Sequence, residues 1–167
     1  LACGTISSNI YDELTTIYPK IKFIKALNNL DNLDPKTTYL FMATKRTVLS
    51  DYIKNKKEKN FYALACDNLA YLIENNLDTK DYLELLLEKY KNKKIDTLIL
   101  GCTHYPLKEQ EIKSIINPKN IITPADEVIN DLSKILINNE NKKLKVKIIN
   151  TKKSISYNKR CYEIIKD

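Results

Sequence analysis

The sequence predicts an α/β protein built from open parallel sheets, and three observations support this fold class. Short apolar runs, which are typical of buried strands, alternate with segments of about ten residues whose apolar positions recur every three to four residues. Strands that alternate with helices in this way form βαβ units, because parallel neighbours need a crossover connection between them. The chain's two glycines adjoin cysteines at corners where an apolar run leads into a helix, at Cys3-Gly4 and Gly101-Cys102.

The expected strands are apolar runs bounded by turn or charged residues. In chain order they lie at 21–26, 38–43, 61–65, 95–100, 121–122 and 146–149. The first alternates apolar and polar residues, the others are more compact, and the turn-rich residues 28–35 predict a linker. Leu1-Ala2-Cys3 reads as the last part of a further buried strand, so we expect the segment to be the later part of a longer protein.

The expected helices have an apolar face and start or stop signals at their ends. Ser7 or Ser8 is expected to cap the first helix, which Pro19 stops. Pro106 suits the first position of another helix, and the Thr123 helix has capping-box spacing. In chain order the helices are expected at 7–18, 48–52, 69–74, 80–91, 106–116, 123–136 and 157–166.

Length and composition limit the function classes. The 167 residues, 43% apolar and 29% charged, are typical of a soluble globular protein. No run approaches the roughly 18 apolar residues of a membrane span, and no signal peptide is recognised. Four cysteines without a close-spaced framework indicate free thiols in a reducing cytoplasm. The net charge of +7 comes almost entirely from scattered lysines, which favours a solvated surface over a nucleic-acid partner.

The most specific motif in the chain is Cys102-Thr103-His104-Tyr105-Pro106. A thiol acts as a base or nucleophile only as the thiolate, and its usual pKa of about 8.5 leaves little thiolate at pH 7. A helix N-terminus and a neighbouring imidazole both favour the thiolate, and His104 is the chain's only histidine. From spacing alone, a small buried Cys102 beside a helix-capping His104 fits equally well.

A second corner of the same kind lies at Cys3-Gly4-Thr5. Gly4 is expected to let a substrate approach the backbone closely, and the free N–H groups of the following helix can hold a carboxylate. Ligands of open α/β sheets bind at such strand-to-helix corners. Two thiols in equivalent positions suit a reaction with two mirror-related faces, in which a proton leaves one side of a carbon and returns to the other.

Other chemistries find less support. A metal site is disfavoured, because Cys-x-His is not a usual chelating spacing and no Cys-x-x-Cys occurs. The residues weighed for it are Cys3, Cys66, Cys102 and His104. No G-x-S-x-G, G-x-G-x-x-G or Walker motif occurs, which removes a serine triad and the common nucleotide loops. Taken alone, Glu74 reads as a solvated helix-end carboxylate, and Cys161 reads as a core residue.

These motifs resemble those of glutamate racemase, within the cofactor-independent aspartate/glutamate racemase superfamily. Residues 100–107 are similar to the family's second cysteine signature, and Ala2-Cys3-Gly4-Thr5 is similar to the first, normally Ala-Cys-Asn-Thr. Residues 43–47 resemble the threonine-bearing loop of the substrate pocket, and 66–74 resemble the segment that ends in the catalytic glutamate. The resemblance covers the chain from its first residue to about residue 137.

The resemblance implies a bacterial-type, cytoplasmic isomerase that supplies D-glutamate for peptidoglycan, and hence for cell-wall biogenesis and cell shape. Its partner would be the small molecule glutamate, without cofactor, nucleic acid or membrane, and a homodimer is left open. Cys3 would remove the α-proton of D-glutamate and Cys102 that of L-glutamate, with His104 and Glu74 supporting Cys102. The residues expected to contact substrate are Gly4, Thr5, Thr44, Thr47 and Thr103.

The resemblance also implies two similar α/β domains, the first built from both ends of the chain. Residues 1–26 and 124–167 would be the remains of an incomplete first domain, and 27–123 an intact second domain. Because the family's N-terminal portion is absent, the 167-residue chain is expected to be inactive. Gly4 replaces an asparagine that contacts substrate, so a racemase acting on aspartate or a related acid stays an alternative. A non-catalytic binding protein that retains the fold is another.

Overall fold

The structure, a computed structural model, describes residues 1–56, 58–135, 159, 161 and 163. Contacts within the chain divide it into two units, Leu1–Leu136 and Ile137–Asp167. The strand expected at 146–149 lies outside the described residues, as does the helix expected at 157–166 apart from residues 159, 161 and 163, which are helical. The division into residues 1–26 with 124–167 and 27–123 stays a prediction.

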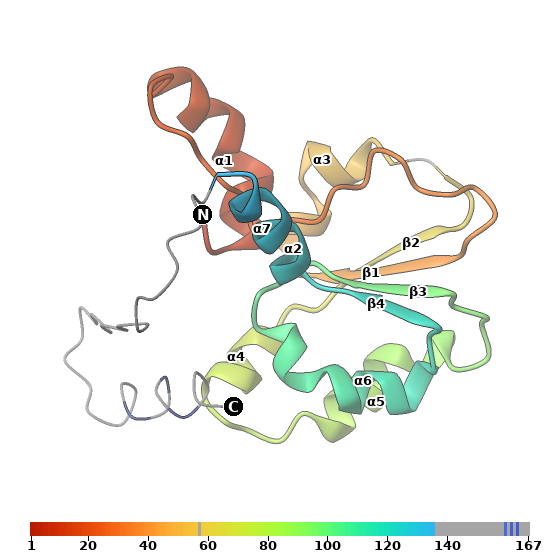
Figure 1. The fold of residues 1–167 in the computed structure, drawn as a ribbon. Coiled ribbons are helices and arrows are strands. Elements are labelled where there is room, and N and C mark those ends of the chain that lie inside the picture. Colours follow the sequence, from red (N-terminus) through yellow and green to blue (C-terminus); the bar gives the residue numbers. More distant parts are fainter. Residues whose placement is uncertain (57, 136–158, 160, 162, 164–167) are drawn as a thin grey trace. The chain divides into compact units, whose positions relative to one another are not determined.

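The first unit contains a four-stranded parallel sheet, which confirms the predicted α/β class (Figure 1). Its order is β2-β1-β3-β4, so β1 and β3 are central, and a crossover joins each strand to the next one in the chain. Tyr39 in β1 pairs with Phe61 in β2 and with Thr97 in β3, which pairs with Asn120 in β4. The strands are β1 Tyr39–Ala43, β2 Phe61–Ala65, β3 Thr97–Leu100 and β4 Asn120–Ile122.

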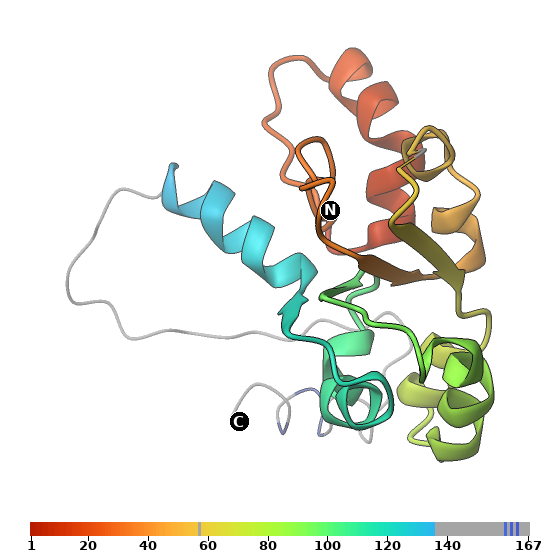
Figure 2. The same ribbon diagram turned by 90° about the vertical axis from the view of Figure 1, so that its right-hand side faces the viewer.

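Helices cover both faces of this sheet, because alternate residues of a strand point to opposite sides. Leu40 and Met42 belong to one core cluster with residues of α4, α5 and α6, and Phe41 and Ala43 to a second cluster with Ile53 of α3. Figures 1 and 2 show the two helical layers. The helices are α1 Gly4–Ile17, α2 Lys45–Val48, α3 Asp51–Lys54, α4 Leu69–Glu74, α5 Lys80–Leu87, η1 Glu88–Tyr90, η2 Tyr105–Lys108, α6 Glu109–Ile116 and α7 Pro124–Ser133.

Capping residues set the helix ends, and at two of them the observed boundary differs from the predicted one. The capping box of Thr123 and Asp126 is formed at α7, and Asn117 ends α6 in the left-handed conformation before Pro118. The first helix begins at Gly4 and not at Ser7 or Ser8, because the Ser7 amide already donates to the Cys3 carbonyl at 2.9 Å. The helix expected at 48–52 is two short helices, α2 and α3, which Ser50 separates as the N-cap of the second.

The strand expected at 21–26 is not formed. The Leu1 amino group donates to the Ile24 carbonyl at 2.6 Å, and the Ala26 amide donates to the Leu1 carbonyl at 3.0 Å. This is the hydrogen-bond pattern of a single rung of a parallel ladder. With one residue as its pairing partner, the alternating segment has too few ladder bonds to count as a strand.

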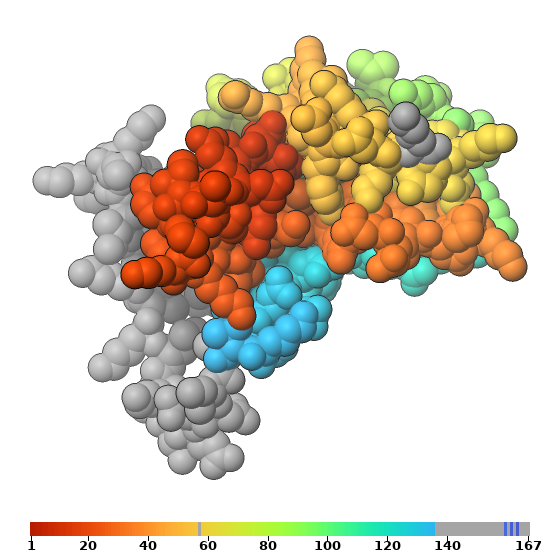
Figure 3. Space-filling model, turned by 90° about the horizontal axis from the view of Figure 1, so that it is seen from above, coloured from red at the N-terminus to blue at the C-terminus, as the bar shows by residue number. Residues whose placement is uncertain are grey.

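Burial differs between the two end segments of the first unit and its central residues. In α1, Ile10 is 38% exposed and Leu14 is half-buried, and Leu132 of α7 is half-buried too. Leu40, Leu83 and Leu98 are fully buried, and Ile115 is half-buried against the same core. Leu136 lies outside the described residues. Figure 3 shows α1 in red and α7 in blue at the surface.

Within the described residues, every helix is too short or too polar to cross a membrane.

Candidate active site

Two strand-to-helix corners carry the predicted thiols. Cys102 lies two residues after the end of β3. The amide of the intervening Gly101 donates to the Met42 carbonyl of β1 at 2.7 Å and so continues the sheet ladder to the corner. Cys3 is the N-cap of α1, in extended conformation. Cys102 is buried and Cys3 is half-buried, and both are free thiols. The corners therefore hold two separate sulfur atoms that no disulfide removes from chemistry.

A relay of three side chains stands at the Cys102 corner. The Cys102 sulfur lies 3.9 Å from Nδ1 of His104, and Nε2 of the same ring lies 2.9 Å from a carboxylate oxygen of Glu74. Glu74 is the last residue of α4, so the fold brings together groups that are 30 residues apart in the chain. A carboxylate at Nε2 favours the tautomer that keeps its proton there, which leaves Nδ1 as an acceptor facing the thiol.

The pKa of Cys102 is raised, which corrects the expectation that the thiolate is favoured at this corner. Burial of the sulfur is the largest cause, and a negative charge on Cys3 raises the pKa further. The backbone amides of His104 and Tyr105 lower it, as a helix start should, but burial outweighs them.

Three threonines expected to contact substrate form one cluster. The Thr5 hydroxyl of α1 lies 2.8 Å from that of Thr44 and 3.2 Å from that of Thr47, and the last two are 3.1 Å apart. Thr44 is also the N-cap of α2, where its side chain accepts from the Thr47 amide. The hydroxyls join the Cys3 corner to the end of β1. Thr103 is exposed.

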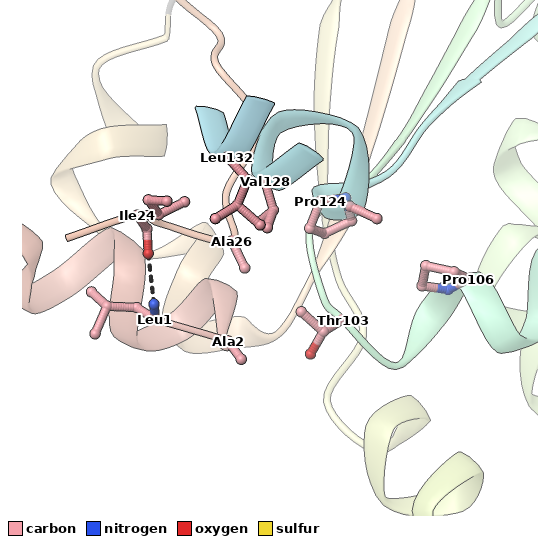
Figure 4. Close-up of a pocket in the computed structure, with 10 residues that line it drawn as sticks. Leu1, Ala2, Ile24, Ala26, Thr103, Pro106, Pro124, Val128 and Leu132 are labelled. Carbon is pink, nitrogen blue, oxygen red and sulfur yellow. Dashed lines mark hydrogen bonds between the residues drawn. The ribbon is translucent and has the colours of Figure 1, made fainter. Parts of the chain in front are cut away.

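An apolar cavity of about 300 Å³ opens beside the two corners (Figure 4). Ala2 and Thr103, each next to a catalytic candidate cysteine, line it. Val128 and Leu132 of α7 form another part of its wall. The residues flanking both thiols therefore face one space. The 6–9 Å separation that we expect between the two sulfur atoms of opposed bases stays a prediction.

The structure differs from the expectation for Gly4. The space in which a side chain would stand is filled by the backbone of Gly101, because a Cβ at Gly4 would lie 2.4 Å from the Gly101 carbonyl oxygen. The group that approaches Gly4 closely is thus the Gly101 backbone. Whether Gly4 also contacts substrate stays a prediction.

Sequence reasoning missed the role of Tyr105. Its ring is fully buried, and its hydroxyl donates to the Cys66 carbonyl at 3.1 Å, which ties the Cys102 corner to the corner from which α4 carries Glu74. A buried tyrosine usually has a partner for its hydroxyl, and this general preference is the signal that points to such a contact. In the part of the chain that the structure describes, no group of three or more His, Cys, Asp or Glu side chains is placed to hold a metal ion.

Burial of the thiols predicts a loss of stability at alkaline pH. Burial raises the pKa of Cys66 to about 12, whereas in the unfolded chain it is about 8.5. Between these values the native state keeps a proton that the unfolded state has lost. The free energy of unfolding therefore falls as pH rises, by up to about 1.4 kcal/mol per pH unit for this group.

Urea unfolding between pH 8 and pH 10.5 would measure this slope. Cys66→Ala is the matched variant: we expect it to be less stable at pH 8 and to have a shallower slope, since the titrating group is gone. Equal slopes in the two proteins would show that Cys66 is not responsible.

The fold and this site define an open parallel α/β protein with a thiol at each of two corners and a thiol–imidazole–carboxylate relay at one of them. No protein-family model matches the chain. It is 31% identical to the glutamate racemase of Hydrogenobaculum sp. (strain Y04AAS1) over 84% of this chain and 59% of the relative. It is 36% identical to that of Fusobacterium nucleatum over 77% and 53%, and 31% identical to that of Clostridium acetobutylicum over 92% and 66%. The chain belongs to the glutamate racemase family.

Solved structures agree with this family assignment. The glutamate racemase of Francisella tularensis, solved in complex with D-glutamate, matches with a TM-score of 0.66 and 28% identity, over 85% of this chain and 59% of that one. The glutamate racemase from Aquifex pyrophilus matches with a TM-score of 0.60 and 28% identity, over 81% and 57%. The chain thus spans a little over half the length of several of the proteins it matches.

Proposed function

We propose that the protein carrying this chain interconverts L- and D-glutamate by transferring protons between two thiols and the substrate Cα, without a cofactor. The observation that supports this most is the Cys102–His104–Glu74 relay at a corner that adjoins the Cys3 corner through the contact of Gly4 with Gly101. In this proposal the small-molecule substrate is glutamate, and the product D-glutamate is used in the cytoplasm for peptidoglycan.

In each turnover, one proton is removed from one face of the substrate Cα and one proton is added to the opposite face. Starting from D-glutamate, the Cys3 thiolate takes the α-proton and becomes a thiol, and the electron pair stays on Cα. The Cys102 thiol then gives its proton to the opposite face, which yields L-glutamate and leaves Cys102 as thiolate. The reverse direction uses the resulting protonation state, so no net proton is consumed.

The raised pKa of Cys102 fits its role as the proton donor in this direction. When Cys102 must act as base on L-glutamate, Nδ1 of His104 is placed to accept its proton, and Glu74 stabilises the imidazolium that forms. In this proposal the Thr5, Thr44 and Thr47 hydroxyls donate to a substrate carboxylate, which helps to hold the developing negative charge.

The test is a side-by-side assay of the complete protein with both enantiomers of glutamate and of aspartate, measured by circular dichroism. We expect the highest kcat/KM with glutamate and a weakened KM, because a hydrogen-bonding asparagine is replaced by Gly4. A clear preference for aspartate would favour the alternative racemase. Tight glutamate binding without turnover would favour a non-catalytic binding protein.

A further inference from the structure

We propose that the contact between Gly4 and Gly101 sets the separation of the Cys3 and Cys102 thiols, so that both glycines are positioning residues. The importance of that separation rests on the proposed two-thiol reaction. The contact itself is tested below without any measurement of racemase activity.

The chain contains only two glycines, and they lie against each other. A Cβ built on Gly4 would stand 2.4 Å from the carbonyl oxygen of Gly101 and 3.4 Å from its carbonyl carbon. Real Cβ atoms do not approach a backbone atom to less than 3.0 Å. The first residue of α1 therefore rests on the peptide group that joins Gly101 to Cys102.

Gly101 is confined on its other side as well. A Cβ at Gly101 would stand 2.4 and 2.6 Å from two ring carbons of Phe41 and 3.1 Å from the Cβ of Ala43. Phe41 is fully buried and its ring stacks on Phe61 at a centroid distance of 6.0 Å. The peptide before Cys102 is thus held between the side chains of β1 and the start of α1.

Space, and not backbone conformation, accounts for both glycines. Neither has a positive φ, so their dihedral angles are open to any residue. What both positions lack is room for a side chain. The two corners consequently meet backbone to backbone, with no room for a Cβ between them.

The thiols are the immediate neighbours of this contact. Cys3 precedes Gly4 as the N-cap of α1, and Cys102 follows Gly101 at the end of β3. A displacement at the contact therefore changes the distance between the two sulfur atoms. Two opposed bases must each lie within about 3–3.5 Å of one Cα, and a misplacement of about 1 Å can cost 10²-fold in rate.

The experiment measures crosslinking of the 167-residue chain by dibromobimane, which alkylates two thiols through a short rigid bridge. A Cys161→Ser background removes the half-exposed fourth cysteine, and peptide mass spectrometry identifies the bridged pair. We expect the parent to bridge Cys3 to Cys102. Crosslinking has two steps: the reagent first alkylates one thiol, and the second thiol then closes the bridge. In Gly4→Ala this closure step should slow by about tenfold or more, while alkylation of Cys3 by monobromobimane is unchanged.

Glu13→Ala is the matched control, since it places alanine on the exposed side of the same helix, and it should crosslink at the parent rate. Cys66 reports folding, because its thiol is completely buried, whereas Cys102 keeps 8% exposure, and Cys66 therefore reacts only when the structure opens. If Cys66 reacts in Gly4→Ala, the closure rate is compared in Gly101→Ala, where the crowded neighbour is the Phe41 ring and the corner must again shift. Closure at the parent rate in a folded variant of either glycine, or no bridge in the parent, would overturn the proposal. These crosslinking results do not depend on racemisation, so they hold even if the complete protein shows no racemase activity.

Discussion

Replacing either Cys3 or Cys102 with alanine is expected to abolish racemisation of glutamate by the complete protein. Each thiol would serve one face of Cα, and without its partner a proton removed from one side has no acid on the other. Loss of a positioned acid or base typically costs 10²–10⁴-fold, so we expect a fall of roughly 10³-fold or more in kcat for both directions. Circular dichroism of glutamate solutions would follow the reaction.

Serine variants separate the two half-reactions. With Cys102→Ser, we expect the α-proton of D-glutamate still to exchange with solvent deuterium, because Cys3 remains, and NMR would detect the exchange. Cys161→Ala is the control, since Cys161 belongs to neither cysteine motif in the sequence, and it should keep parent activity. Racemisation at the parent rate in either alanine variant would contradict the assignment of two bases.

The second large effect concerns the 167-residue chain by itself, which we expect to be inactive and to self-associate. Apolar side chains of α1 and α7 face outward, with Ile17 at 56% and Ile129 at 65% exposed. The cavity beside the corners has an almost wholly apolar lining and is open to solvent. Patches of this kind promote association, and a wet site weakens the electrostatic stabilisation that deprotonation of Cα needs.

Sedimentation velocity, thermal unfolding and a racemase assay on the purified chain would test this expectation together. We expect concentration-dependent association and no turnover. A monomer that unfolds cooperatively and racemises glutamate would show that these 167 residues are sufficient.

Much of the central sheet could be predicted because its signal is local. The predicted strand at 61–65 matches β2 residue for residue, and those at 38–43 and 95–100 differ from β1 and β3 only at their first residues. Each is a compact apolar run whose neighbours on both faces also lie within the chain. The segment at 21–26 has an equally clear pattern, yet a strand needs partners, and here the hydrogen bonds reach only Leu1.

In the candidate site, too, only the features with a local sequence signal could be predicted. The spacing of Cys102 and His104 predicts a thiol beside an imidazole, and the structure places them 3.9 Å apart. Glu74 as the third member came from family resemblance, because no local pattern connects a helix end to a histidine 30 residues later. The direction of the Cys102 pKa shift could not be predicted from the sequence either, because it depends on how deeply the fold buries the sulfur. The contact between the two glycines required three-dimensional packing in the same way.

The ring of threonine hydroxyls described above has a consequence for discrimination. Three hydroxyls within 2.8–3.2 Å of one another can satisfy their donors among themselves. A ligand group that enters must therefore take a donor from an existing hydrogen bond between Thr5, Thr44 and Thr47. A carboxylate compensates for this loss, because charge-assisted hydrogen bonds are about twice as strong as neutral ones. A neutral amide or hydroxyl of the same size would only exchange one neutral bond for another. In the proposed reaction the ring would act as a filter for charge, and it would penalise an amide analogue of glutamate even where the shape fits.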